Sequence, residues 1–119
     1  MSKETFFDAY VECALWTTND ESDESGGRPL DENYDPEDID PKTLAEMRRE
    51  CDEFYDANQE MFDHDAQAGH DFWLTRNGHG AGFWDGDYPE HEGKALTDAS
   101  KAYGSSDLFL GNDGVIYGN

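Results

Sequence analysis

A large excess of carboxylates is the feature of this sequence that most restricts what the chain can fold into. Asp and Glu contribute 29 residues and Lys and Arg only 8, a formal net charge of -21 over 119 residues. Charge of one sign repels itself and weakens a compact state. Only 35% of the residues are hydrophobic, but they include 3 Trp, 6 Tyr and 7 Phe. Because each such ring buries roughly 150–250 Å², we predict a folded domain rather than an acidic disordered tail, which would be poor in aromatic residues.

Three segments of the chain predict helices. Residues 5–16 show apolar side chains at the spacing of one helical face. Asp40 is a favourable N-cap and Pro41 occupies a first helical position, where its missing N–H costs nothing, so a second helix is expected to run to about Phe62. Residues 94–103 predict a short third helix that the following glycine ends.

Two further segments predict β-hairpins. Residues 69–87 contain the aromatic runs 72–74 and 83–84 on either side of Asn77-Gly78 and further glycines, which is typical turn chemistry. Residues 108–117 repeat the pattern around Gly111-Asn112-Asp113-Gly114. The sequence therefore predicts a single α+β domain spanning residues 1–119 in the order ααββαββ, with helices packed on one face of a small antiparallel sheet.

The segment from about residue 18 to residue 40 differs in kind from the rest. It holds ten carboxylates against one arginine, and its Gly-Gly pair and two prolines interrupt regular structure. One interpretation is a flexible, solvated acidic loop. The other is an anionic loop that docks on a basic partner and becomes ordered there. Its carboxylates are the first choice for partner contacts: Asp20, Glu21, Asp23, Glu24, Asp31, Glu32, Asp35, Glu37, Asp38 and Asp40.

The charge also favours one class of partner over others. The few basic residues are scattered, so no basic patch is available for direct contact with DNA, RNA or an anionic membrane. Since duplex DNA carries about one charge per 1.7 Å, 21 net charges match roughly 36 Å of duplex. We therefore predict a DNA mimic that occupies the basic groove of a DNA- or RNA-binding host protein. The outer face of the second helix is the second choice for contacts: Glu46, Glu50, Glu53 and Glu60.

Other interpretations remain open at this stage. Trp73 and Trp84 are expected either in the core or, in part, as exposed anchors of a protein–protein adaptor. Low lysine content also fits adaptation to high salt. The histidines suggest a metal-dependent enzyme as a further alternative, although no pair of them has the spacing of a metal-binding motif. We expect no catalytic residue, metal or cofactor; the polar group to inspect for an active site is Asp71, Arg76, Asn77 and His79.

Compartment and assembly are also predicted from the sequence. The N-terminal apolar segment contains acidic residues and is followed by no cleavage-type sequence, so no signal peptide is expected. We therefore expect a cytoplasmic protein, inside a host cell, with Cys13 and Cys51 reduced as two small core residues or, alternatively, as a regulatory thiol pair. A homodimer is left open.

One segment carries a resemblance to known proteins. The stretch AGHDFWLTRNGHGAGFWDGD at residues 68–87, together with LTDASKAYG and a glycine-rich C-terminal hairpin, resembles small acidic proteins of bacteriophages and mobile elements, mostly of unassigned function. The resemblance implies a phage or prophage source and no established catalytic residues. In size and charge alone, the chain is also similar to phage DNA-mimic inhibitors of restriction, CRISPR or DNA-repair enzymes.

Overall fold

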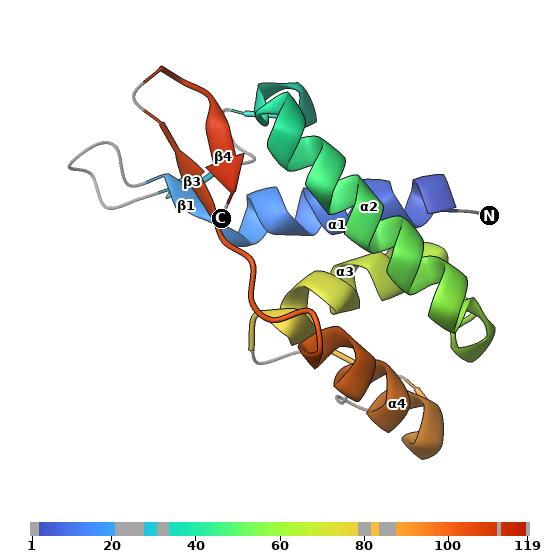
Figure 1. Cartoon of the computed structure of the whole chain (residues 1–119). Helices are drawn as coiled ribbons and strands as arrows, with labels where there is room; N and C mark the ends of the chain where they lie inside the picture. Colours follow the sequence, from blue (N-terminus) through green and yellow to red (C-terminus); the bar gives the residue numbers. More distant parts are fainter. Residues whose placement is uncertain are drawn as a thin grey trace.

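The computed structural model describes residues 3–20, 28–30, 34–78, 82–83, 88–111 and 113–118. The fold is α+β with helices predominating (Figure 1). In chain order its elements are α1 (Lys3–Thr17), β1 (Asn19–Asp20), β2 (Arg28–Pro29), the 3-10 helix η2 (Pro36–Asp38), α2 (Pro41–Asn58), the 3-10 helix η3 (Gln59–Met61), α3 (Asp65–Arg76), α4 (Glu90–Lys101), β3 (Leu108–Leu110) and β4 (Ile116–Gly118).

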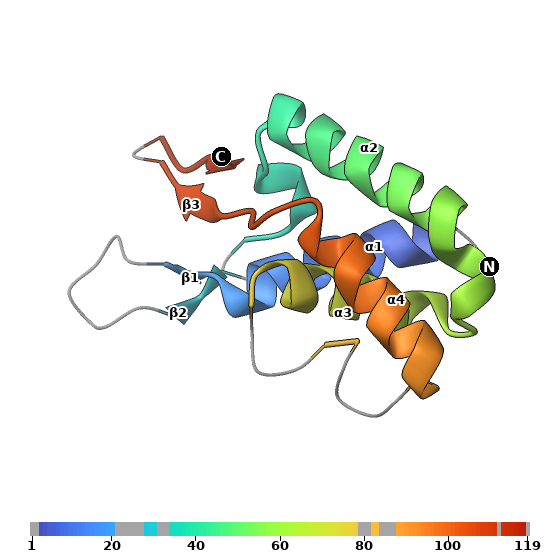
Figure 2. The ribbon, with the colours of Figure 1, turned by 60° about the horizontal axis from the view of Figure 1, so that its bottom comes forward.

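Helix α1 is the centre of the molecule. It packs against both α2 and α3, and α4 packs against α3. Figure 2 shows α2 on one side of α1, with α3 and α4 on the other. Aromatic rings fill the space between these helices: Phe54 and Phe72 stack with centroids 4.1 Å apart, and Phe6 stacks on Phe54 at 5.9 Å. The expectation that rings would build the core of this apolar-poor chain is therefore confirmed.

The predicted hairpin at residues 69–87 is wrong, because its first strand lies in helix α3. The buried residues of this segment include Ala68, Phe72, Thr75 and Arg76, spaced three and four apart as on one side of a helix. A short aromatic run is compatible with a strand or with a buried helix, and periodicity alone does not separate the two. The asparagine and glycine that suggested a hairpin turn instead end the helix, with Gly78 at φ 70°.

Gly69 explains why a glycine stands inside α3. A Cβ at this position would overlap the carbonyl oxygen of Phe6 and lie 3.1 Å from the backbone nitrogen of Tyr10. Helices α1 and α3 therefore approach each other backbone to backbone at this point. A glycine in a helix interior costs about 1 kcal/mol relative to alanine, and here the close packing of two helices offsets that cost.

The remaining elements agree more closely with the sequence. The Asp40 side chain accepts a hydrogen bond from the Thr43 amide, and Pro41 follows it, so the predicted start of α2 is confirmed. The C-terminal hairpin is confirmed as β3 paired antiparallel with β4. Helix α4 begins earlier than expected, at Glu90.

The predicted single sheet and the order ααββαββ are wrong. The described strands form two separate two-stranded pairs, β1–β2 and β3–β4. The first pair lies within the segment expected to be all loop. Outside its own hairpin, strand β4 makes a parallel bridge, from Ile116 to Ile39, which lies just before α2. No described helix combines the length and the apolar character needed to cross a membrane.

Both cysteines are unpaired and buried in the core, as the first interpretation expected. Burial raises the pKa of the Cys13 thiol to about 12 and also raises that of Cys51. Only the thiolate reacts readily, so neither thiol is expected to react with dithionitrobenzoate in the native protein at about pH 8. Both should react once urea unfolds the chain, and rapid reaction before unfolding would contradict this burial.

Candidate functional site

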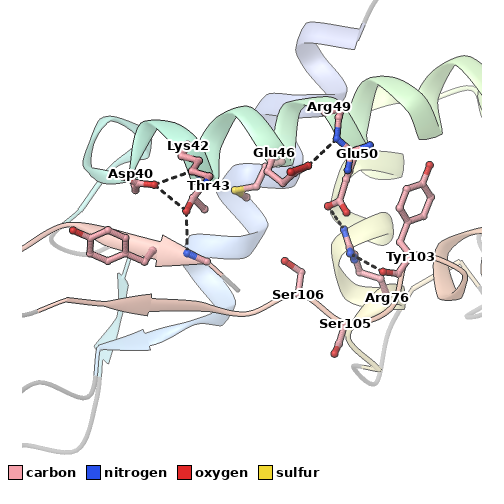
Figure 3. A pocket seen from close by; sticks show the side chains of 13 residues that line it. Asp40, Lys42, Thr43, Glu46, Arg49, Glu50, Arg76, Tyr103, Ser105 and Ser106 are labelled. Atoms are coloured by element: carbon pink, nitrogen blue, oxygen red, sulfur yellow. Dashed lines mark hydrogen bonds and ion pairs between the residues drawn. The ribbon is translucent and has the colours of Figure 1, made fainter.

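A cavity of about 580 Å³ lies between α2 and the C-terminal part of the chain (Figure 3). Both basic and acidic side chains line it. The basic ones are Lys42, Arg49 and Arg76, and the acidic ones include Glu46 and Glu50. The chemistry available in the cavity depends on how many of these groups are already bonded to one another.

All three side-chain nitrogens of Arg76 donate hydrogen bonds within the fold. Its side chain is 3% exposed, and one terminal nitrogen donates to Glu50 Oε1 at 2.7 Å and to the Tyr10 hydroxyl at 3.0 Å. Its Nε donates to the Gly104 carbonyl at 2.8 Å, and the other terminal nitrogen donates to the Tyr103 carbonyl at 3.1 Å. Burial alone would lower the pKa of Arg76, but the hydrogen bonds to Glu50 and Tyr10 outweigh it and the pKa is raised. Arg76 thus joins α1, α2, α3 and the turn that follows α4.

The other polar groups singled out near Arg76 are bonded in the same way. Asp71 is buried and accepts a hydrogen bond from the Tyr88 hydroxyl at 2.8 Å. The Asn77 side-chain oxygen accepts from the Ser106 amide at 2.7 Å. His79 lies outside the described residues. The structure therefore uses Asp71, Arg76 and Asn77 to hold the fold together.

Side chains at the other end of the cavity also hold elements of the fold together. Thr43 Oγ1 donates to Asp40 and accepts from the Gly118 amide at 3.1 Å, which fastens β4 to the start of α2 (Figure 3). A covalent mechanism needs a nucleophile with a positioned base; the described residues that line this cavity include Lys42, Ser105 and Ser106 but no His or Cys. Among all described residues, no three His, Cys, Asp or Glu side chains are grouped to hold a metal ion.

The acidic outer face predicted on α2 is partly neutralised, because two arginines lie against three of its four carboxylates. Arg49 lies 2.7 Å from Glu46 and 3.5 Å from Glu53. Glu50, expected on this outer face, instead points inward, with its side chain 19% exposed and bound to Arg76. Only Glu60, which lies in η3, makes no ion pair with a described basic residue. The carboxylates of α2 itself therefore contribute less net field than their number suggests.

A second concavity has a different character. It lies beside α1, where η2 and the start of α2 approach that helix, and has a volume of about 300 Å³. We call it the α1 groove. Its apolar lining comes from Phe7, Val11, Leu15, Tyr34, Leu44 and Pro36, and its carboxylates are Asp8, Glu12 and Asp35.

Carboxylates around the α1 groove lack the basic neighbours found on α2. Asp8, Asp35 and Glu37 are exposed and form no ion pair with a described Lys, Arg or His. Glu12 lies 3.6 Å from His70, which is charged only when protonated. Phe7, Val11 and Leu15 are already buried in the fold, so the exposed apolar part of the groove comes mainly from Tyr34, Pro36 and Leu44, with negative charge at its edge.

Aromatic exposure differs from the sequence prediction. Trp73 is 2% exposed and its indole N–H donates to Thr17 Oγ1 at 2.7 Å, so it is a core residue and not an exposed anchor. Trp84 lies outside the described residues. Trp16 is 56% exposed, and sequence reasoning missed it. The signal was its position four residues after Glu12 and eight after Asp8, on the polar side of α1.

The carboxylates of the acidic segment are only partly placed. Asp35, Glu37, Asp38 and Asp40 lie in or beside η2, where Asp35 caps the 3-10 helix by accepting from the Glu37 amide at 2.9 Å. Asp20 belongs to β1. The remaining predicted contact residues lie outside the described part of the chain: Glu21, Asp23, Glu24, Asp31 and Glu32.

Comparison with known proteins adds no relative to this description. No protein-family model, no curated protein sequence and no solved structure matches the chain. The resemblance to small acidic phage proteins stays a prediction, and the function has to be argued from the charges and surfaces described above.

Proposed function

We propose that this protein mimics DNA and inhibits a nucleic-acid-binding protein by occupying that protein's basic groove. The contact is made by carboxylates on α1 together with those of residues 19–40, which include η2. A role against a host defence, repair or transcription protein, encoded by a phage and acting in the host cytoplasm, is the biological setting that this proposal implies.

The observation that carries the proposal is the density of carboxylates in one segment of the chain, ten against one arginine over residues 19–40. The segment from residue 19 to residue 40 has a net charge of -9, and its described part lies against α1. Asp8 and Glu12 are four residues apart on α1, which places such side chains about 5–6 Å from each other. A row of carboxylates can replace phosphates in a basic groove, because both release the counterions held there.

Uneven distribution of charge supports mimicry over adaptation to salt. Lys3, Arg48 and Arg49 pair with acidic residues on or beside α2, whereas Asp8, Asp35 and Glu37 have no such described partners. General salt adaptation would favour acidic residues over the whole surface. The high density of carboxylates over residues 19–40 instead fits a single complementary partner.

Competition with DNA tests the proposal. Proteins from a bacterial lysate are bound to immobilised duplex DNA at low salt, and the purified protein is added to release them. We expect a defined set of DNA-binding proteins to be released by the wild type. The variant Asp8→Asn/Asp35→Asn/Glu37→Gln should release at least about tenfold less, because three contact charges are lost while Asn retains the cap of η2.

A matched variant controls for net charge alone. Glu46→Gln/Glu53→Gln/Glu60→Gln also removes three carboxylates, but two of them are already paired with Arg49. It should release the same proteins as the wild type within about threefold. The proposal fails if wild-type protein releases nothing from the DNA, or if both triple variants lose activity equally.

A protein–protein adaptor is the second candidate function, favoured by two exposed aromatic side chains. Trp16 is 56% exposed and Phe109, in β3, is 50% exposed. An adaptor that used these rings would lose its partner after Trp16→Ala or Phe109→Ala and would keep it after the acidic substitutions. The same binding assay therefore separates the two functions.

A further inference from the structure

We infer that the α1 groove binds an apolar side chain projecting from a basic amphipathic helix of the partner. The inference rests on the proposed function for the view that the partner is basic. It adds the kind of structure that the partner presents: an aliphatic anchor flanked by arginine or lysine.

The size and lining of the groove fit a small apolar group. Its volume of about 300 Å³ lies at the lower end for ligand-binding pockets. Phe7, Val11 and Leu15 come from successive turns of α1, and Tyr34 and Leu44 complete the lining from the opposite side. The carboxylates of the lining lie at its edge and its other side chains are largely apolar, so burial of apolar area supplies the affinity for the anchor.

The carboxylates at the edge of the α1 groove indicate which side chains flank the partner's apolar anchor. Asp8 and Glu12 lie on one side of the groove and Asp35 on the other, with Glu37 two residues further. On a helix, residues three and four positions from an anchor lie next to it, so basic side chains at those positions can reach both edges. An acidic or neutral helix would leave these carboxylates without a counter-charge.

An arginine of the protein itself already lies against one of the apolar side chains of the groove. Arg48 lies over the ring of Phe7, with its guanidinium carbon 4.8 Å from the ring centroid. Its charge is held by Glu4 at 3.1 Å and Asp52 at 3.1 Å. Arg48 therefore covers a face of the Phe7 ring and forms no ion pair with Asp8 or Asp35, whose charges are available to a partner's cations.

A synthetic helical peptide is the probe. It has about 18 residues, two leucines four positions apart, arginines on the flanking positions and a fluorescent label for anisotropy. We expect Leu44→Arg to weaken its binding at least tenfold, because the new side chain fills the groove and neutralises its edge. Ala45→Arg adds the same charge at the adjacent, exposed position and should weaken binding less than about threefold.

A second peptide keeps the inference testable if Leu44→Arg does not fold. Replacing both leucines of the peptide by alanine should reduce its affinity for the wild-type protein at least tenfold, since each replacement removes apolar area from the contact. The inference is overturned if the alanine peptide binds as tightly as the leucine peptide, or if Ala45→Arg and Leu44→Arg weaken binding equally.

The DNA-competition assay separates this inference from the proposed function. If Leu44→Arg still releases proteins from DNA and the acidic triple variant does not, mimicry holds and the groove plays no part. If the peptide binds in the groove but the wild type releases nothing from DNA, the groove is a docking site and the DNA-mimic function is wrong.

Discussion

Replacement of Arg76 by methionine is expected to lower the free energy of unfolding by about 3–5 kcal/mol. The substitution leaves the partly buried Glu50 carboxylate without its counter-charge and the carbonyls of Tyr103 and Gly104 without their described donor. Methionine fills much of the same volume, so the loss reports the missing charge and hydrogen bonds. Urea unfolding followed by tryptophan fluorescence measures it.

Two controls separate this effect from a general loss of charge. Arg49→Met removes an exposed arginine from the same cavity and should cost less than about 1 kcal/mol. Adding Glu50→Gln to Arg76→Met should restore part of the stability, because the uncompensated charge is removed. If Arg76→Met is no more destabilising than Arg49→Met, the network around Arg76 does not hold the helices together as described.

Replacement of Gly69 by alanine is the second substitution with a large expected effect. Alanine favours a helix by about 1 kcal/mol over glycine, but its Cβ would overlap the Phe6 carbonyl oxygen at the contact of α1 with α3. Two backbones cannot move apart locally as a side chain can, and overpacking of a core costs about 1–3 kcal/mol or more. We expect a net loss of at least about 2 kcal/mol, measured by thermal unfolding.

Gly104 provides the comparison for that experiment. It has φ 74°, but a Cβ there would meet nothing within 4 Å. Gly104→Ala should therefore cost only the roughly 1–2 kcal/mol of a left-handed backbone in a non-glycine residue. A Gly69→Ala protein that is as stable as the wild type, or more so, would show that α1 and α3 do not approach as closely as the structure indicates.

Local sequence signals located most helices but failed where burial hides periodicity. Asp40 and Pro41 mark the start of α2 because a cap and a first-turn proline act within a few residues. Helix α3 is buried on most sides, so Phe72, Trp73 and Leu74 form a continuous apolar run that resembles a strand. Gly69 reads as a turn residue unless the backbone of α1 beside it is known.

The candidate site shows the same limit. The proposal that the chain binds a cation-rich partner rests on composition, since the chain has 29 acidic residues and only 8 basic ones. The α1 groove combines Phe7, Tyr34 and Leu44, which are joined only by the tertiary fold. Whether an acidic residue is free or paired also depends on neighbours distant in sequence, as with Glu50 and Arg76, 26 residues apart.

The contact of α1 with α3 has a consequence for the synthesis of the protein. Chains emerge from the ribosome N-terminus first, so α1 leaves it well before its main packing partner has been translated. Until α3 follows, Phe6 and Tyr10, which contact it in the finished fold, remain exposed to solvent. The nascent chain therefore passes through a stage in which its most apolar helix is available to chaperones, and its abundant carboxylates help to keep that stage from aggregating.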